Sequence, residues 1–463
     1  MSNSPLFDLN LIQRYDKAGP RYTSYPSAVQ FNAHFLEEHY REAARLSNEE
    51  LLPRALSLYF HIPFCDTICY YCGCNKVVTK DRSKAELYLQ YISKEVVMQG
   101  ALFDRDRVVE QLHWGGGTPT FLSHQQMRDL MAVTRENFTL RDGDGGEYSI
   151  EIDPREIQHK SIALLRELGF NRMSLGVQDF DSRVQKAVNR IQPEEMTRST
   201  LEAARREGFK SVSMDLIYGL PLQNLESFDV TLQRVIDLDP DRLSVFNYAH
   251  LPHLFKPQRR IHAEELPTPA EKLDILQLSL ERLTAAGYVY IGMDHFAKPS
   301  DELALAQNKG TLYRNFQGYS THAECDLIGL GASSIGSVYN SYDQNVRDLD
   351  GYYAALDAGH LPLFRGYELE ADDLLRREII TQIICHFCLD TNKIAQQWEI
   401  QFENYFESEL AELEVMQQDG LLTLQDGFLQ VESKGRLLVR NICQVFDRYN
   451  RPDAADKRFS RLI

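Results

Sequence analysis

Three cysteines carry the clearest chemical signal in this sequence. Cys65, Cys69 and Cys72 have the spacing Cys-x3-Cys-x2-Cys within the segment HIPFCDTICYYCGCNK. Thiolates are the usual ligands of iron–sulfur clusters. Three of them from one tight loop would hold three irons of a cubane and leave the fourth open. The open iron could chelate a small ligand through an amine and a carboxylate, so the spacing favours a 4Fe–4S cluster with an open coordination site.

Two other interpretations of these cysteines stay open. Structural zinc usually takes two cysteine pairs roughly a dozen or more residues apart. Here Cys65 and Cys74 enclose all four cysteines within ten residues, which makes a compact zinc site possible but awkward. A reactive dithiol at Cys69 and Cys72 is the third interpretation. Cys74 would be left over beside a three-cysteine cluster, either as a packed core thiol or as a side chain that reaches into the site.

A glycine run and two carboxylates add weaker signals. Trp114-Gly-Gly-Gly-Thr-Pro-Thr lacks the ending of a phosphate loop. Its glycines would let backbone groups approach a ligand closely, or would simply form a turn. Glu151 and Asp215 stand in largely apolar segments, where a buried carboxylate needs a partner. Ribose hydroxyls, a ligand amine or a neighbouring arginine would serve.

Two further features have competing interpretations. Arg190 could pair with a ligand carboxylate or with a surface glutamate. Cys385 and Cys388 resemble half of a metal site. They lie in the apolar, helix-like run IITQIICHFCL, however, and core packing is the favoured interpretation there.

The elements that must position these residues alternate between strand-like and helix-like segments. Six strand–helix units in order predict a parallel sheet covered by helices. The predicted strands are 56–61, 108–114, 148–152, 172–177, 211–217 and 242–248, and the helices between them are 83–102, 124–138, 162–168, 194–207 and 225–238.

The chemistry-bearing residues cluster at one end of these predicted strands. Ligands bind at the carboxyl ends of parallel strands in α/β sheets and barrels. The first strand leads into the cysteines, and each of the next five ends in glycine, carboxylate, amide or tyrosine residues. We therefore expect one site at that end, built from six strands.

Composition narrows the classes of function. The chain has 463 residues, a net charge of −17 and 43% hydrophobic residues. Such an acidic chain predicts no nucleic-acid partner, and no apolar run is long enough for a membrane span. The N-terminus lacks a secretory pattern. Half of the eight cysteines lie within ten residues, and in a large chain such clustering points to metal or redox chemistry rather than to disulfides. The expected location is the cytoplasm.

The sequence beyond residue 366 predicts a separate domain. Its segments are mostly helix-like, and residues 421–424 and 428–431 flank Gln425-Asp426-Gly427, a hairpin signal. Helices with a small hairpin are typical of a winged-helix-like domain. The acidic composition favours a packing or lid role over DNA binding.

Taken together, the motifs resemble a known family. The cysteine loop followed by GGGTPT resembles the radical S-adenosylmethionine superfamily. Further segments narrow the resemblance to the oxygen-independent coproporphyrinogen III oxidases of bacterial haem synthesis, over nearly the whole chain. They include GPRYTSYP (19–26), EIDPRE (151–156), GVQDF (176–180), DLIYGLP (215–221), DRLSVFNYAHLP (241–252), IGMDHFAKP (291–299), RNFQGY (314–319) and GRLLVRNIC (435–443).

The resemblance implies a fold and an activity. The fold is α/β, an incomplete six-stranded (β/α)6 TIM-like barrel with a mainly helical C-terminal domain. The activity converts two propionates of coproporphyrinogen III into vinyl groups, giving protoporphyrinogen IX through a 5′-deoxyadenosyl radical. It implies an external flavodoxin- or ferredoxin-like electron donor, an unknown electron acceptor and a monomer. The alternative is a related haem chaperone without oxidase activity, which typically lacks the fourth cysteine and has a shorter N-terminus.

The resemblance also assigns site residues. It implies a cluster on Cys65, Cys69 and Cys72 and a catalytic role for Cys74. One S-adenosylmethionine would contact Tyr59, Tyr71, Gly116, Gly117, Thr118, Glu151, Ala249 and Ile335. A second would contact Gln178, Arg190 and Asp215. Arg21, Lys298 and Arg314 are the candidates for binding the carboxylates of the substrate.

These implications predict four regions. Residues 1–49 would form an N-terminal segment that contributes to the substrate site, and residues 50–300 the barrel core. Residues 301–365 would connect the two domains while packing on the core, and residues 366–463 would form the helical C-terminal domain.

Overall fold

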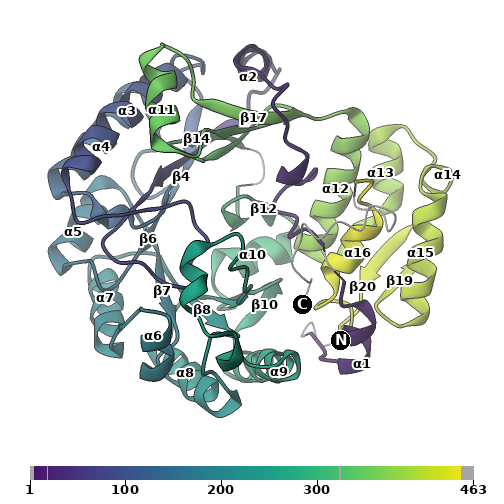
Figure 1. Cartoon of the computed structure of the whole chain (residues 1–463). Helices are drawn as coiled ribbons and strands as arrows, with labels where there is room; N and C mark the ends of the chain where they lie inside the picture. Colours follow the sequence, from purple (N-terminus) through teal and green to yellow (C-terminus); the bar gives the residue numbers. More distant parts are fainter. Residues whose placement is uncertain (1–4, 18, 323–324, 450–463) are drawn as a thin grey trace. The chain divides into compact units, whose positions relative to one another are not determined.

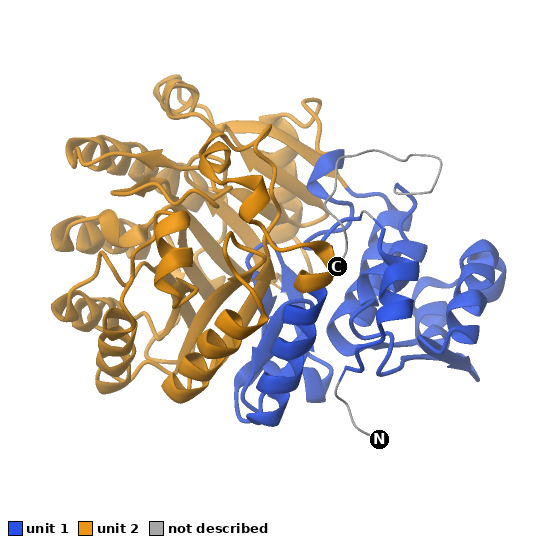
Figure 2. Cartoon of the chain, turned by 60° about the horizontal axis from the view of Figure 1, so that its bottom comes forward, with its two compact units in different colours: residues 1–30, 273–323, 369–463 blue, residues 31–272, 324–368 orange. Residues whose placement is uncertain are grey.

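The structure is a computed structural model that describes residues 5–17, 19–322 and 325–449 (Figure 1). The chain divides into two compact units (Figure 2). Unit 1 comprises residues 1–30, 273–323 and 369–463, and unit 2 comprises residues 31–272 and 324–368. The four regions expected from the sequence remain a prediction.

Unit 2 is built on one continuous sheet with the strand order β9-β8-β7-β6-β4-β1-β14-β15-β16-β17. Neighbouring strands from β9 to β14 run parallel, and the remaining strands pair antiparallel. The six predicted strands are confirmed as β1 (Ala55–Ile62), β4 (Val108–Gly116), β6 (Glu147–Ile152), β7 (Arg172–Gln178), β8 (Ser211–Tyr218) and β9 (Arg242–Asn247).

Helices cover the outer side of these strands, as Figure 1 shows for α3, α4, α5, α7 and α8. This arrangement confirms the α/β barrel-like class expected from the alternating segments. The helices of unit 2 are α2 (Glu37–Asn48), α3 (Ser83–Gly100), α4 (His124–Asn137), α5 (His159–Leu168), α6 (Ser182–Ala187), α7 (Glu194–Arg206), α8 (Leu225–Leu238) and α11 (Leu349–Asp357).

The two faces of the parallel strands differ in chemistry. Successive strand residues point to opposite faces. In β1, Leu58 and Phe60 are completely buried on one face, while Tyr59 and His61 occupy the other. Strand register carries this second face across the sheet through the pairs Tyr59↔His113, Glu151↔Ser174 and Gly176↔Asp215. A polar row therefore lines the face opposite the apolar one.

The four strands that continue the sheet past β1, on the side away from β4, were not predicted. They are β14 (Cys325–Leu330), β15 (Ile335–Val338), β16 (Ser341–Asn345) and β17 (Leu363–Glu368). All five residues of β16 are buried, including Asp343, which is 2% exposed. The Oδ1 atom of Asp343 has no hydrogen-bond partner among the described residues. Burial, followed by the nearby Glu95 carboxyl, raises the pKa of Asp343 to about 8.

Substitution Asp343→Asn is expected to raise the thermal midpoint more at pH 8 than at pH 5. In the folded chain the Asp343 carboxyl keeps its proton at pH values where the unfolded chain has lost it. Folding stability therefore falls as pH rises toward 8. An asparagine amide has the same shape and does not ionise. The substitution therefore removes a loss of folding stability of a few kcal/mol at most. Calorimetry at both pH values measures the difference, and equal shifts would assign the effect to packing.

Unit 1 contains helices, a three-stranded sheet and two strand pairs. The predicted hairpin is confirmed as β19 (Leu422–Gln425) and β20 (Phe428–Val431), with β18 (Cys388–Asp390) pairing to β20. Two other hairpins, each with a two-residue turn, precede it along the chain. They are β10 (Val289–Gly292) with β11 (His295–Ala297), and β12 (Tyr313–Asn315) with β13 (Gly318–Ser320). Its helices are α1 (Leu9–Tyr15), α9 (Pro269–Ala285), α10 (Glu302–Lys309), α12 (Ala371–His386), α13 (Thr391–Trp398), α14 (Phe402–Tyr405), α15 (Glu407–Gln418) and α16 (Val439–Val445).

The pair Cys385 and Cys388 departs from the expected single helix. Helix α12 ends at His386, and Phe387 adopts a left-handed conformation with φ of 57°. Cys385 is fully buried in the helix, whereas Cys388 begins a strand. Burial raises the pKa of Cys385 to about 12, as expected for a packed core thiol. None of the described helices is long and apolar enough to span a bilayer.

Candidate active site

The four clustered cysteines lie on the loop that follows β1. The loop begins at β2 (Phe64–Cys65) and ends at β3 (Val77–Val78), and these short strands pair in parallel with Cys65 opposite Val78. The backbone N–H of Thr79 donates to the carbonyl of Cys65 at 3.0 Å, and that of Val77 donates to Pro63 at 2.7 Å. Backbone pairing therefore closes the loop at its base.

Neighbouring elements hold the middle of the cysteine loop. The side chain of Asn189 donates to the carbonyl of Ile68 at 2.7 Å, and the N–H of Tyr70 donates to Val188 at 3.0 Å. Gln258 donates to the carbonyl of Tyr71 at 2.9 Å. The loop is thus fixed by contacts from several segments of unit 2.

The glycine run after β4 packs directly against the start of this loop. Gly117 donates to the carbonyl of Ile62 at 2.8 Å, and Thr118 donates to that of Phe64 at 2.7 Å. A Cβ atom on Gly117 would lie 2.7 Å from the Phe64 carbonyl oxygen, a separation that forces the two segments apart. The small side chain is required for this close backbone approach. The approach of the same glycines to a ligand stays a prediction.

The three proposed ligand thiols have different surroundings. Thr118 Oγ1 lies 3.6 Å from the sulfur of Cys65, and burial raises the pKa of Cys65 to about 12. Arg155 and Arg190 place guanidinium nitrogens 3.5 Å and 3.6 Å from the sulfur of Cys69. These two guanidinium groups place positive charge beside one of the proposed ligands of a cluster that carries negative charge.

Cys74 contacts the site through Cys72. The two thiols are within hydrogen-bonding reach, and this contact, with help from Lys76, lowers the pKa of Cys72 to about 6. Lys76 Nζ donates to the carbonyl of Cys72 at 3.0 Å. Cys74 is an exposed residue that also interacts with Glu151. Between the two interpretations of Cys74, its exposure disfavours a packed core thiol.

Glu151 stands at the carboxyl end of β6 with its side chain 46% exposed. Its Oε2 accepts a hydrogen bond from the Gly116 N–H at 3.1 Å, and its Oε1 lies 3.4 Å from His113 Nε2. Its partial burial opposes ionisation, but the contacts with His113 and Gly116 outweigh this effect and lower the pKa of Glu151. A charged carboxylate with accessible surface can accept bonds from a ligand amine or hydroxyl.

Tyr59 and two histidines surround that carboxylate. Tyr59 stacks on His113, with ring centroids 5.7 Å apart and an interplanar angle of 11°. The Tyr59 hydroxyl lies 3.2 Å from His61 Nδ1, and His61 Nε2 contacts the Asn75 carbonyl at 2.9 Å. These contacts join the end of β1 to the loop just beyond Cys74.

Asp215 and Arg190 lie farther along the same row of strands. Asp215 accepts from the Ser174 hydroxyl at 2.9 Å, and burial raises the pKa of Asp215 to about 6. Arg190 forms an ion pair with Asp153 at 3.0 Å and donates to the Gly176 carbonyl at 2.6 Å. Arg190 is only 6% exposed, so its partner in this structure is an internal carboxylate rather than a surface glutamate.

The structure brings most of the other predicted contact residues to the same strand ends. Gln178 closes β7 in a left-handed conformation with φ of 70°. Tyr71 lies within the cysteine loop, where it packs against the buried cluster that includes Leu220. Ala249 follows β9, and its carbonyl accepts from Gln258 at 3.2 Å. Ile335 differs, because it begins the antiparallel strand β15.

Sequence reasoning missed several residues of this site. His61 and His113 share a strand face with Tyr59, and the two-residue alternation of β1 and β4 could have revealed them. Arg155 gave no such signal. Its contact with Cys69 depends on how the loop after β6 meets the cysteine loop, which residue spacing alone does not fix.

The residues present fit an iron–sulfur cluster. Three thiols come from one loop whose backbone is held by other parts of the unit, and two guanidinium groups stand beside one of them. Within residues 5–17, 19–322 and 325–449, no three His, Cys, Asp or Glu side chains converge as a single-ion site requires. A cubane places each thiolate on a different iron, and therefore does not require that convergence.

Comparisons with known proteins agree with this geometry. A family model described as the Radical SAM superfamily matches residues 59–235, and one described as the HemN C-terminal domain matches residues 369–438. Oxygen-independent coproporphyrinogen III oxidase from Pseudomonas aeruginosa is 54% identical over 99% of both chains. The Escherichia coli enzyme of that name is 50% identical, covering 99% of this chain and 98% of the relative.

A solved structure shares the fold as well. Coproporphyrinogen III oxidase (HemN) from Escherichia coli, described as a radical SAM enzyme, matches with a TM-score of 0.92 and 49% identity. The match covers 97% of this chain and 100% of that one. The sheet, the cysteine loop and the family model together define a radical S-adenosylmethionine protein, whose cofactors are a 4Fe–4S cluster and S-adenosylmethionine. More particularly, this chain belongs to the oxygen-independent coproporphyrinogen III oxidase family.

Proposed function

We propose that this chain converts two propionate groups of coproporphyrinogen III into vinyl groups without oxygen, giving protoporphyrinogen IX. Each conversion removes a hydrogen atom from the propionate β-carbon, releases carbon dioxide and passes one electron to an external acceptor. The observation that carries the proposal is the full-length identity of 54% to a relative of this activity. It extends through the matched C-terminal region, so the likeness is not confined to the radical core.

The proposed site divides the work between cofactors and protein. When bound, the cluster and S-adenosylmethionine supply a one-electron cleavage that yields a hydrogen-abstracting carbon radical. We assign Cys65, Cys69 and Cys72 as cluster ligands. Glu151 and Tyr59 would bind S-adenosylmethionine, together with Tyr71, Gly116, Gly117, Thr118, Ala249 and Ile335. Most of these residues lie towards the carboxyl ends of the parallel strands, where the surrounding protein would shield that ligand from bulk water.

A second S-adenosylmethionine is part of the proposal. Gln178, Arg190 and Asp215 are the residues assigned to it. Asp215 would accept from hydroxyls or an amine of the ligand, since a hydroxyl from Ser174 already binds it in this way. Arg190 is already paired with Asp153, so it would act on that ligand while keeping an internal partner.

Partners and location complete the proposal. The reaction needs an electron donor of the flavodoxin or ferredoxin type and an acceptor that we leave unassigned. We propose that the chain acts as a monomer. Its eight free cysteines suit a reducing compartment, which supports the cytoplasm as its place of action.

Anaerobic incubation tests this function directly. Reconstituted protein is mixed with coproporphyrinogen III, S-adenosylmethionine and a chemical reductant. Protoporphyrinogen IX, methionine and 5′-deoxyadenosine are the expected products. No product, combined with stable haem binding, would favour a haem chaperone instead.

Among the candidates for binding substrate carboxylates, Arg314 has the clearest structural support. It lies on β12, is only 8% exposed, and stacks over the Tyr319 ring with its guanidinium carbon 4.8 Å from the ring centroid. In the described part of the chain, its Nε and Nη1 atoms have no hydrogen-bond partner. Arg21, by contrast, already pairs with Asp294 at 3.3 Å. A buried guanidinium with unused donors is suited to a carboxylate.

Substitution Arg314→Gln is expected to raise KM for coproporphyrinogen III about tenfold or more. A hydrogen bond to a charged group contributes roughly 1.5–3 kcal/mol, and glutamine removes the charge. Iron content and the S-adenosylmethionine affinity should stay unchanged. Arg21→Gln, which alters a half-buried and already paired arginine, is the matched control with a smaller effect. An unaltered KM in a folded Arg314→Gln protein would rule out this role.

A further inference from the structure

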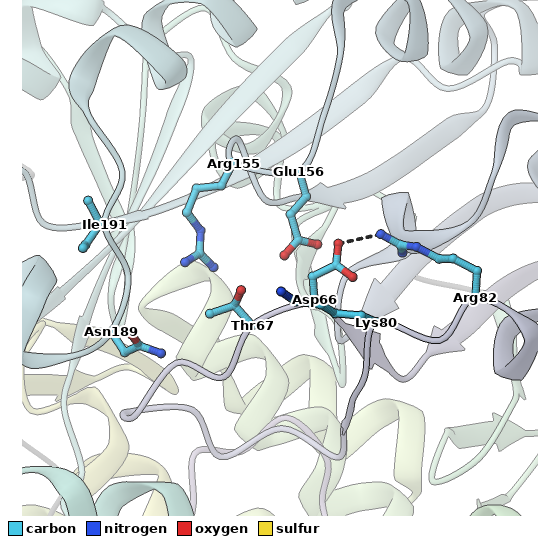
Figure 3. Close-up of a pocket in the computed structure, with 8 residues that line it drawn as sticks. All are labelled: Asp66, Thr67, Lys80, Arg82, Arg155, Glu156, Asn189 and Ile191. Atoms are coloured by element: carbon cyan, nitrogen blue, oxygen red, sulfur yellow. Dashed lines mark hydrogen bonds and ion pairs between the residues drawn. The ribbon is translucent and has the colours of Figure 1, made fainter.

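A pocket of about 540 Å³ opens beside the base of the cysteine loop in unit 2 (Figure 3). Four segments contribute to it: the loop just after Cys65, the segment after β3, the loop after β6 and the loop after α6. The residues that line it are Asp66, Thr67, Lys80, Arg82, Arg155, Glu156, Asn189 and Ile191. None of them belongs to the sets assigned above to the cluster or to S-adenosylmethionine.

Residues that line the pocket, or that lie next to it in the chain, contact the cysteine loop directly. Arg155 lines the pocket and also places Nη2 3.5 Å from the sulfur of Cys69. Asn189 lines it and donates to the backbone between Cys65 and Cys69, at Ile68. The segment that carries Lys80 is hydrogen-bonded to Cys65 through the Thr79 N–H at 3.0 Å. Three separate contacts therefore connect this surface to the cluster loop.

The segment beside the pocket is cationic in a chain of net charge −17. Residues 76–84 contain Lys76, Lys80, Arg82 and Lys84 against one acidic residue, Asp81. Lys80 and Lys84 are exposed. The positive charge is thus concentrated where the loop reaches the surface, and it would attract an anionic partner that the rest of the molecule repels.

The acidic residues of the pocket weaken this positive charge only in part. Asp66 forms an ion pair with Arg82 at 2.5 Å, the contact drawn in Figure 3. Burial, with the nearby Asp153 and Asp66, raises the pKa of Glu156 to about 7. Glu156 therefore carries less than a full negative charge at neutral pH.

Two exposed apolar side chains flank the same surface. Ile191 lines the pocket and is 59% exposed, and Val78, opposite Cys65 in the β2–β3 pair, is 41% exposed. A few apolar contacts among charged residues are typical of protein interfaces. Redox encounters are at the small and transient end of the range of interface sizes. The surface has the chemistry of such an encounter site.

We propose that this pocket and the cationic segment 76–84 dock a small acidic one-electron carrier protein, which reduces the cluster from this side. The inference rests on the proposed function, because only a redox cluster on the cysteine loop needs such a partner. Lys80 and Lys84 attract and orient the carrier, and Ile191 and Val78 provide the apolar contact. One electron passes from the reduced carrier to the oxidised cluster, and no bond is made or broken in this step.

Charge reversal at the two lysines tests the proposal. Cluster-loaded Lys80→Glu/Lys84→Glu protein is mixed anaerobically with reduced flavodoxin, and cluster reduction is followed by its absorbance. The second-order rate constant is expected to fall about tenfold or more at low salt. The difference should shrink as salt rises, because screening weakens attraction between exposed charges. Lys80→Arg/Lys84→Arg keeps both charges and should retain the original rate.

Two controls separate docking from damage to the site. Lys210→Glu reverses a lysine just before the amino end of β8, whereas the cysteine loop follows the carboxyl end of parallel β1. It should leave the rate with flavodoxin unchanged. Reduction by dithionite, followed by product formation, should proceed equally in all variants.

The outcomes distinguish this inference from the proposed function. An unchanged flavodoxin rate in the doubly reversed variant overturns the docking site, while product formed with dithionite leaves the oxidase activity intact. An equal loss with Lys210→Glu, or an equal loss with dithionite, also overturns it. Failure of every variant and of the unaltered protein to form product with dithionite would count against the proposed function itself.

Discussion

Replacement of Cys65 by serine is expected to abolish cluster binding. Three thiolates on one loop are the minimum for a cubane with one open iron, and a serine hydroxyl is a poor substitute for a soft thiolate. Loss of groups that only support metal ligands already costs about 10–100-fold in affinity or activity. Loss of a direct ligand should therefore lower turnover by more than about 100-fold.

Iron and sulfide analysis after anaerobic reconstitution measures this effect. The unaltered chain should bind about four irons in a cubane, with a brown colour, and Cys65→Ser should bind almost none. Cys388→Ser is the matched control, because that half-buried thiol lies at the start of β18, in unit 1. It should retain both iron and activity. A Cys65→Ser protein with a full cluster would exclude Cys65 from the ligand set. Zinc in place of iron in the unaltered chain would refute the assignment of an iron–sulfur cluster.

Replacement of Cys74 by serine is expected to keep the cluster and to lose turnover. The three proposed ligands remain in place, and the backbone of the loop is held by residues other than Cys74. Cys74 itself is exposed and lies beside Cys72 and Glu151, where it could reach a bound reactant. Groups that act on reacting atoms typically contribute about 10²–10⁴-fold in rate.

Two measurements on the same preparation check this expectation. Electron paramagnetic resonance of the reduced protein should give the same cluster signal as the unaltered chain, while protoporphyrinogen formation should fall about 100-fold or more. Cys74→Ala should behave in the same way, since neither variant carries a thiol. A fully active Cys74→Ser enzyme would refute the catalytic role and reopen the comparison with the haem chaperones.

The parallel part of the fold followed from the sequence. Each of the six predicted strands has an apolar face and lies within two residues of its observed bounds at both ends. The helices between them showed clear periodicity, and α8 (Leu225–Leu238) was predicted at its observed bounds. These segments are governed by local pattern and burial, which residue order records directly.

The strands β14 to β17 escaped prediction because their sequence lacks that pattern. In β16 every residue is buried, including polar Asp343 and Asn345. Burial of polar side chains becomes possible only through tertiary partners, such as the bond from Asn345 to Glu95 at 2.6 Å. The pairing of β14 with β1 likewise joins residues more than 250 positions apart, and no local rule reports it.

The candidate site, like the fold, was only partly predictable from the sequence. Residue types and spacing singled out the cysteines, Glu151 and Asp215. The structure places the cysteines after β1, Glu151 near the end of β6 and Asp215 in the second half of β8, three strands of one parallel sheet. The placement of Arg155 and Arg190 against Cys69 could not be read from the sequence, because it depends on three loops meeting. The roles assigned to individual residues stay predictions until variants are measured.

The way the cysteine loop is fastened has a consequence for oxygen exposure. Its backbone is bound to Asn189, Gln258 and the glycine run by contacts that involve no metal. If air destroyed the iron–sulfur centre, the cysteine loop would therefore keep its backbone conformation rather than unfold. Repair would require only fresh iron, sulfide and electrons, without a new round of folding.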